Sequence, residues 1–254
     1  MGISERHQSI LKKLKEEGKV NIQELSDEMQ VSSVTIRKDL KFLEEMNLLY
    51  RTRGGGSLTN PYIMERSIHE KALINADEKQ KIAKKALTFV HNHDSIIIGS
   101  GTTAFELARQ LSPSHHVTVI TPAAKVTLEL SNKPNIEVFQ LGGLIRSKSS
   151  SVIGTVAEHT LEGISCELLF MGVDGIDMEF GFSTTNINEA SLGLKMIESA
   201  QTVFVLADST KFNKRGLGKI CNLEQVQYLI TDDKVSPKDI KFLEERGVQV
   251  IVAK

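Results

Sequence analysis

From residue 76 to the end of the chain, short segments rich in apolar residues alternate with segments whose apolar residues recur at helical spacing. This alternation is typical of a largely parallel β-sheet covered by helices on both faces, because successive parallel strands need a crossover that a helix supplies. It predicts an α/β fold of Rossmann-like type. We expect strands at residues 95–98, 117–121, 136–141, 168–173, 203–207, 228–231 and 248–252. We expect helices at residues 103–111, from 122, and at 156–161, 188–199 and 237–246.

The first sixty residues follow a different pattern. Apolar residues at helical spacing predict helices at residues 4–17, after Asn21, and at residues 33–46. A β-prone run then meets a glycine cluster within residues 48–58, which indicates a small hairpin. Three short helices and a hairpin predict a winged helix-turn-helix. We therefore expect an N-terminal DNA-binding domain at residues 1–58, a linker at 59–75 and a larger domain at 76–254.

The third predicted helix has one apolar stripe and one cationic face. On a helical wheel, Ile36, Leu40 and Leu43 fall together and form the buried stripe. The opposite side combines cations with a small apolar side chain, the mixture that reads guanine edges, phosphates and thymine methyl groups in the major groove. A solvated basic face on an ordinary three-helix module is the alternative. The candidate DNA-binding residues are Ser33, Val34, Thr35, Arg37, Lys38 and Lys41 on the helix, and Arg51 and Arg53 on the hairpin.

The total charge of the chain decides little about nucleic-acid binding. The chain holds 31 Lys and Arg against 32 Asp and Glu, a formal net charge of −1. Residues 1–60 hold ten basic and nine acidic residues, a net +1, and the other 194 hold 21 and 23, a net −2. Contact with DNA would therefore depend on where the cations stand, and not on a general excess of positive charge.

The first strand of the larger domain runs into a loop of glycines and hydroxyl residues, GSGTT, at residues 99–103. Such a loop at a helix N-terminus can hold a phosphate, because glycines let the backbone approach and small hydroxyls add donors. No GK[ST] follows, so it is not a Walker loop. A tight structural turn is the alternative. The candidate phosphate contacts are Ser100, Gly101, Thr102 and Thr103.

Three later segments also follow predicted strands and carry polar residues. They lie at residues 172–177, at 181–189 and at 207–212. The carboxyl ends of strands in an open α/β sheet meet at one edge, where ligands bind. These segments would add carboxylates for sugar hydroxyls and a cation, so the combined crevice suits a phosphorylated sugar. The further candidate ligand-binding residues are Asp174, Gly175, Asp177, Thr184, Thr185, Glu189 and Lys211.

The helix and hairpin residues carry a specific resemblance. Residues 31–40, 43–44 and 51–55 read VSSVTIRKDL, LE and RTRGG, and they resemble the N-terminal signature of the DeoR family of bacterial transcriptional regulators. Lys38 stands where that family commonly has a second Arg, and Arg53 stands where His is common. Both changes keep or add donors, so the resemblance implies DNA binding with an operator preference of its own.

The larger domain resembles the DeoR C-terminal sensor domain, whose shape is similar to that of ribose-5-phosphate isomerase. Gly99 stands where the family often carries Asp, which changes the contacts offered to sugar hydroxyls. The resemblance implies a phosphate loop, two acids of a DGxD motif, a catalytic-base position and the lysine of a D-S-x-K segment. In that order these are Gly101-Thr102-Thr103, Asp174 and Asp177, Glu189, and Lys211.

Together these features predict a DNA-binding transcriptional regulator, and specifically a repressor of a carbohydrate-utilisation operon. Its partners would be double-stranded operator DNA and a phosphorylated sugar that controls operator affinity. Because one module buries too little surface for specific regulation, we expect a homodimer or homotetramer on paired half-sites. One alternative is a sugar-phosphate isomerase with an appended DNA-binding module, in which Glu189 is the base and Lys211 stabilises an enediolate. Another is an architectural DNA binder that ignores small molecules.

The remaining features argue against other classes of protein. Cys166 and Cys221 stand alone, and the first residues form no apolar signal region, so we expect a cytoplasmic protein with reduced thiols. No apolar run approaches the roughly 20 residues of a membrane helix, so we expect no membrane partner. His115 and His116 lack a third ligand at useful spacing. We expect neither a metal nor a cofactor.

Overall fold

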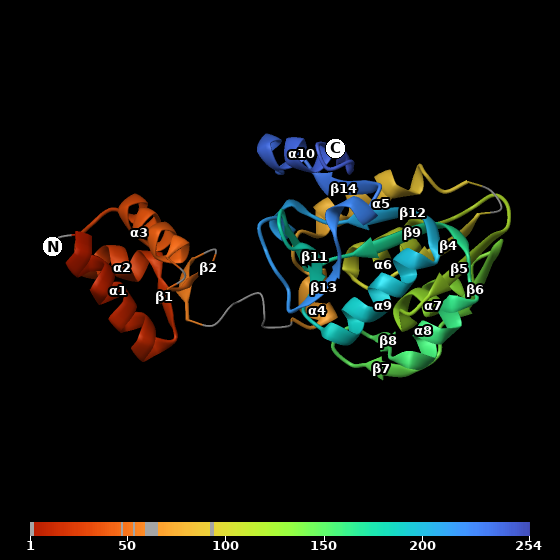
Figure 1. Ribbon diagram of the computed structural model, residues 1–254, viewed down its shortest axis with the longest axis horizontal. Coiled ribbons are helices and arrows are strands. Elements are labelled where there is room, and N and C mark those ends of the chain that lie inside the picture. The colour runs from red at the N-terminus through yellow and green to blue at the C-terminus, as the bar shows by residue number, and fades with distance from the viewer. Residues whose placement is uncertain (1–2, 47, 53, 59–65, 92–93) are drawn as a thin grey trace. The chain divides into compact units, whose positions relative to one another are not determined.

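The computed structural model describes residues 3–46, 48–52, 54–58, 66–91 and 94–254. The chain divides into two compact units, residues 1–64 and 65–254, which are drawn in red to orange and in light orange to blue in Figure 1. Part of the predicted linker is therefore wrong. Residues 66–75 belong to the larger unit, where they include helix α4 (Ile68–Ala72). The rest of that linker, residues 59–65, lies outside the described residues.

The small unit has three helices and a three-stranded antiparallel sheet, which confirms the winged helix-turn-helix. Strand β1 was not expected, since three residues are too short to show a pattern; it pairs with β3 in the order β1-β3-β2. A Cβ at Gly55 would lie 1.7 Å from the carbonyl oxygen of Val20, so only glycine fits at this position, where β3 pairs with β1. The elements are α1 (Ile3–Glu17), β1 (Lys19–Asn21), α2 (Ile22–Met29), α3 (Ser33–Glu45), β2 (Tyr50–Thr52) and β3 (Gly55–Ser57).

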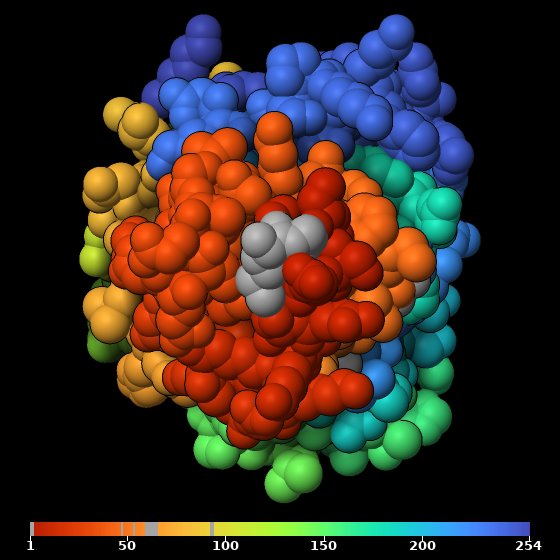
Figure 2. Space-filling view, turned by 90° about the vertical axis from the view of Figure 1, so that its left-hand side faces the viewer, coloured from red at the N-terminus to blue at the C-terminus, as the bar shows by residue number. Residues whose placement is uncertain are grey.

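Polar caps and an apolar core position α3 in this unit. The Asn21 side chain accepts a hydrogen bond from the backbone N–H of Gln23 at 2.7 Å and begins α2. The Ser32 side chain accepts one from the N–H of Thr35 and begins α3. The core beneath the helices consists of Ile10, Leu14, Val20, Leu25, Ile36, Leu40, Leu43 and Leu49. In Figure 2 the red residues of α1 lie beside the orange residues of the later elements on the surface of this unit.

A buried ion pair joins α1 to α3. The guanidinium of Arg6 donates to both oxygens of Asp39, at 2.5 and 2.9 Å, and His7 Nε2 lies 3.0 Å from Oδ1. The His7 ring also stacks on Phe42, with centroids 4.9 Å apart. Asp39 lies on the inner side of α3, so this pair fixes how the helix is held without occupying its outer face.

The larger unit is built on a seven-stranded sheet in the order β15-β14-β12-β9-β4-β5-β6, in which every neighbouring pair is parallel. This confirms the Rossmann-like α/β fold. Each predicted strand is present, with ends shifted by no more than three residues. The strands are β4 (Ser95–Ile98), β5 (Val117–Thr121), β6 (Ile136–Gln140), β9 (Cys166–Gly172), β12 (Ala200–Leu206), β14 (Tyr228–Asp232) and β15 (Gln249–Ala253).

Helices cover both faces of this sheet (Figure 1). One core lies between the sheet and helices α5, α6 and α7, and the other lies between the sheet and α8, α9 and α10. Among the described residues, no helix is long and apolar enough to cross a membrane. These helices are α5 (Ala76–Leu87), α6 (Thr102–Gln110), α7 (Ala124–Leu130), α8 (Thr155–Glu162), α9 (Ile187–Glu198) and α10 (Pro237–Glu244).

Two small antiparallel sheets were not expected from the sequence. Their strands have three or four residues each, too few for an alternation of apolar and polar residues to be recognised. One is the hairpin of β7 (Leu144–Arg146) and β8 (Ser151–Ile153). The other has the order β10-β11-β13 and is formed by β10 (Gly175–Asp177), β11 (Gly181–Thr184) and β13 (Gly218–Cys221).

We predict that Asp39→Asn destabilises the small unit by about 3 kcal/mol at pH 7, because the buried Arg6 guanidinium loses its counter-charge. Burial would raise the pKa of Asp39, but hydrogen bonds and charge from Arg6 and His7 outweigh it and hold that pKa below its ordinary value. The contribution is therefore complete above the unfolded pKa of about 3.9 and is lost as the pH falls towards the lowered folded one. Native-state hydrogen exchange of α1 and α3 amides in urea measures it.

The control is Glu45→Gln, which changes an exposed carboxyl at the end of the same helix. It should stay within about 0.5 kcal/mol of the wild type. Equal effects of the two substitutions, or an Asp39→Asn effect that persists unchanged at pH 3, would contradict the role given to this pair.

Candidate functional site

The outer face of α3 is cationic and open. Arg37, Lys38 and Lys41 are exposed, and Val34 between them is 57% exposed. The Lys41 ammonium lies 3.7 Å from Glu45, an exposed pair of little strength. Ser33 and Thr35 are half-buried at the start of the helix, next to its N-cap. Val34, Arg37, Lys38 and Lys41 thus share one face opposite the buried stripe, with Ser33 and Thr35 at its N-terminal end.

The hairpin residue Arg51 is tied to the end of this helix. Its backbone N–H donates to Glu44 Oε1 at 2.8 Å, and its guanidinium lies 3.7 Å from Glu44 Oε2. The contact fixes β2 beside α3, so the two cationic points move as one body. Part of the Arg51 charge is balanced by Glu44, which the sequence pattern did not indicate. Arg53, the second predicted hairpin contact, lies outside the described residues.

A polar pocket opens at the carboxyl edge of the large sheet, where the loops after β4, β9 and β12 meet. Its empty volume, counted out to its open mouth, is about 660 Å³. Eight of the eleven predicted ligand residues line it: Ser100, Gly101, Thr102, Thr103, Asp174, Thr184, Glu189 and Lys211.

The loop after β4 presents the N-terminus of α6 to this pocket. Gly101 is the N-cap with φ of +120°, and as a glycine it has no side chain to cap the first amides of the helix. Those amides are therefore available to an anion, as is usual for a phosphate at a helix start. At Gly99 a Cβ would lie 3.2 Å from the Cβ of Met171, so close packing of β4 on β9 favours glycine where the family often has Asp.

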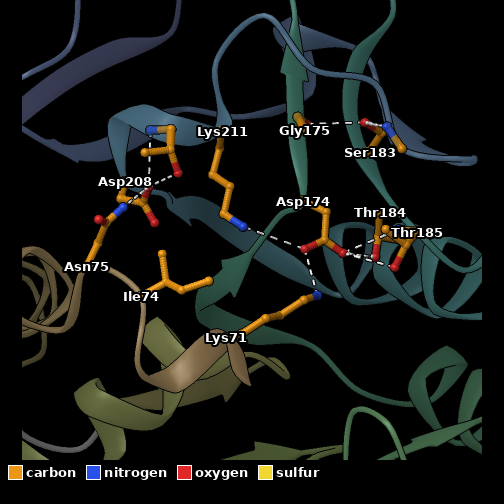
Figure 3. A network of polar contacts seen from close by, with 12 residues as sticks. Lys71, Ile74, Asn75, Asp174, Gly175, Ser183, Thr184, Thr185, Asp208 and Lys211 are labelled. Carbon is orange, nitrogen blue, oxygen red and sulfur yellow. Dashed lines mark hydrogen bonds and ion pairs between the residues drawn. The ribbon is translucent and has the colours of Figure 1, made fainter. Parts of the chain in front are cut away.

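Asp174 is the centre of the hydrogen-bond network in the pocket (Figure 3). It accepts from Lys71 Nζ at 2.7 Å, from Thr184 Oγ1 at 3.1 Å, and from the N–H and Oγ1 of Thr185 at 3.3 and 3.2 Å. The Lys211 ammonium lies 3.7 Å away. Burial would raise the pKa of Asp174, but the charges of Lys71 and Lys211 and these hydrogen bonds hold it well below its usual range. The carboxylate therefore stays ionised. Thr185 does not line the pocket itself but holds this carboxylate in place by hydrogen bonds.

The pocket is lined by more cations than anions. Lys79 is only 4% exposed, and its ammonium donates to the carbonyls of Lys71, at 2.6 Å, and Ile74. Desolvation lowers the pKa of Lys79. The motifs in the sequence did not indicate the lining cations Arg66, Lys71, Lys79 and Lys148. For Lys79 a helical wheel would have done so, because the residue falls on the buried side of α5. The five lining cations are Arg66, Lys71, Lys79, Lys148 and Lys211, against Asp174 and Glu189.

Glu189, on the pocket wall, is held in an ion pair. Arg146 donates to its Oε1 at 2.7 Å, and both side chains are largely buried. The contact brings hairpin strand β7 to the start of α9, which the Asn186 side chain caps by accepting from the N–H groups of Asn188 and Glu189.

Two predicted ligand residues, Gly175 and Asp177, are absent from the pocket lining. Asp177 accepts from the N–H groups of Glu179 and Phe180 at 3.0 and 2.7 Å and pairs with Arg215 at 2.7 Å, so it holds the turn between β10 and β11. A Cβ at Gly175 would lie 2.4 Å from the carbonyl oxygen of Lys214. Asp177 therefore stabilises a turn, and Gly175 is a site of close backbone packing.

Comparison with known families agrees with this organisation. A model of the DeoR-like helix-turn-helix domain matches residues 6–61, and a model of the DeoR C-terminal sensor domain matches residues 74–233. The chain belongs to the DeoR family. This DeoR-family regulator has a DNA-reading unit and a sensor unit. The residues that line the pocket lie in the matched sensor domain, except Arg66, Ile68 and Lys71, which precede it.

Curated relatives of this DeoR-family chain extend over nearly its full length. It is 36% identical to a putative aga operon transcriptional repressor of Escherichia coli O157:H7, over 99% of this chain and 94% of that protein. It is 36% identical to the regulator YulB of Bacillus subtilis, over 98% and 96%. It is 32% identical to the lactose phosphotransferase system repressor of Lactococcus lactis, over 95% of each.

Solved structures give weaker similarity. A ribose-5-phosphate isomerase in complex with phospho-erythronic acid has a TM-score of 0.40 at 16% identity, over 54% of each chain. A probable sor operon regulator of Shigella flexneri has a TM-score of 0.44 at 10% identity, over 71% of this chain and 91% of that one.

We predict that Arg37→Ala combined with Lys38→Ala weakens binding to cognate DNA and lowers the slope of log affinity against log salt by up to about 1.8, if both cations neutralise phosphates. The DNA is a duplex selected from random sequence by the wild-type protein. Fluorescence anisotropy at several salt concentrations measures both quantities. Lys12→Ala with Lys15→Ala, two exposed lysines of α1, is the matched control. An equal loss in the control would refute the assignment of the α3 face.

Proposed function

We propose that this chain is a repressor of a carbohydrate-utilisation operon, and that a phosphorylated sugar in the sensor pocket controls its affinity for operator DNA. The excess of cations on the pocket wall, beside the uncapped N-terminus of α6, supports the proposal most directly. The names of two relatives, an aga operon repressor and a lactose phosphotransferase repressor, agree with control of sugar use.

The charge of the pocket indicates the class of ligand. Asp174 and Glu189 are already paired with Lys71 and Arg146, so an incoming anion would meet the amides of α6, Lys79 and the other lining cations. Among the described residues the buried Lys79 ammonium donates to carbonyls, a costly arrangement for a charge, and an anion beside it would offset that cost. We place the phosphoryl group there and the sugar hydroxyls against Asp174 and the hydroxyls of the β11 end.

Control of DNA binding requires that the ligand bind two arrangements of the protein unequally. A typical coupling of 1–3 kcal/mol would change operator affinity about 5- to 150-fold. The family resemblance favours ligands that weaken DNA binding. We further propose a cytoplasmic homodimer or homotetramer that reads paired half-sites, because one winged module offers little surface for specific binding.

A sugar-phosphate isomerase remains the alternative against which this proposal is measured. The relatives are named as regulators and repressors, which gives the alternative no support. Glu189, the residue that would serve as the base, has its carboxylate engaged by the Arg146 guanidinium instead of being free to accept a substrate proton. The absence of turnover with a bound sugar phosphate would separate a sensor from an enzyme.

A thermal-shift screen tests the proposal. Ribose 5-phosphate, glucose 6-phosphate, fructose 1-phosphate and glycerol 3-phosphate are compared with their unphosphorylated counterparts. At about 100 times its dissociation constant a ligand adds about 2.7 kcal/mol, which for a unit of this size raises Tm by roughly 5–10 °C. The effective compound should also change affinity for the selected DNA duplex. No shift with any phosphorylated compound, or an equal shift with the free sugar, would defeat the proposal.

We predict that Lys211→Ala weakens binding of the effective compound about 10- to 100-fold, because one charge-assisted contact of the pocket is lost. Isothermal titration measures the change. The control is Lys238→Ala, an exposed lysine of α10 away from the pocket, which should bind as the wild type does. Unaltered affinity in the Lys211 variant would mean that the ligand lies elsewhere.

A further inference from the structure

The segment that follows the boundary between the two units forms part of the pocket wall. The larger unit begins at residue 65, so Ile68, the first residue of α4, is its fourth residue. Arg66, Ile68 and Lys71 all line the pocket. The chain that comes from the DNA-reading unit therefore passes the ligand pocket before it enters the α/β core at α5.

Helix α4 is held to the larger unit mainly by polar contacts. Of its five residues only Ile68 is buried, and Leu73 directly after it is 85% exposed. The Ile68 N–H donates to the carbonyl of Lys148 at 2.8 Å, and Lys71 reaches Asp174. The buried Lys79 ammonium also donates to the Lys71 carbonyl, so α4 is held by polar contacts and little apolar burial. A second cavity, of about 470 Å³ out to its mouth, adjoins it and is lined in part by Ile68, Ala72, Ala76, Thr102 and Phe105.

In the ion pair between Lys71 of α4 and Asp174 of the pocket, Asp174 has more hydrogen-bond and ion-pair partners than Lys71 has. Asp174 has further partners in Thr184, Thr185 and Lys211, so it would remain satisfied if Lys71 left (Figure 3). In the part of the chain that the structure describes, Asp174 is the one carboxylate paired with Lys71. An anion in the pocket can therefore attract the Lys71 ammonium without leaving a buried carboxylate unpaired.

We propose that α4 couples the pocket to the DNA-reading unit, and that Lys71 is the residue that senses the ligand. In the free protein Lys71 holds α4 on Asp174; when the phosphoryl group of the ligand is bound, the ammonium turns to it and α4 changes position. Because residues 59–65 join α4 to the small unit, this changes how that unit is tethered. The inference rests on the proposed function, and it assigns the coupling to one ion pair.

Hydrogen exchange of peptides within residues 66–75 tests this inference on the full chain, with and without the panel compound that gives the largest thermal shift. In the wild type the ligand should change their exchange rate several-fold. In Lys71→Met the rate without ligand should already match the liganded wild type, and ligand should change neither that rate nor affinity for the selected duplex, although a thermal shift remains. Lys71→Arg should restore the response, and Lys84→Met, an exposed lysine of α5, should behave as the wild type.

Two results would overturn the inference while leaving the proposed function intact. One is a ligand that shifts Tm and alters DNA affinity in the wild type without any change in exchange at residues 66–75. The other is a Lys71→Met protein whose DNA affinity responds to the ligand as strongly as that of the wild type. By contrast, no thermal shift with any panel compound would remove the proposed function and this inference together.

Discussion

All strands of the main sheet run in the same direction, and the position of the pocket follows from this. Parallel strands end at a common edge, so the loops after β4, β9 and β12 converge there although they are far apart in the sequence. Lys71 and Asp174 are 103 residues apart in the sequence, yet Lys71 Nζ lies 2.7 Å from Asp174 Oδ1. The edge collects polar groups that the apolar cores on the two faces of the sheet could not hold. The same constraint seats α6 with its N-terminus at the pocket.

The sequence predicted best where a periodic pattern is enforced by burial. The strand at Ser95–Ile98 and the helix that follows it were predictable because residues buried on both faces must be apolar. The stripe of Ile36, Leu40 and Leu43 fixed the outer face of α3 for the same reason. In both cases the spacing of apolar residues in the sequence follows from which side chains must be buried.

Prediction was weaker where a residue takes its role from partners that are distant in the sequence. Asp177 belongs to a motif that suggested a ligand contact, but two backbone N–H groups and Arg215 engage its carboxylate in a turn. Lys71 belongs to no motif and stood in a segment taken for linker, yet it reaches the centre of the pocket. Motifs report which chemistry is available, and only the tertiary contacts decide which groups are left for a ligand.

The polar groups of the pocket support the proposal that it holds an anion. Lys79 is buried against carbonyls, Lys71 and Lys211 share one carboxylate, and Arg146 is matched to Glu189. Each carboxylate is therefore neutralised, while net positive charge stays on the wall. Desolvated cations lower the free energy of an incoming phosphoryl group more than exposed ones do. Because one of these cations lies on α4, the proposed coupling would use the electrostatic gain on binding to move that helix, as control of the DNA-reading unit requires.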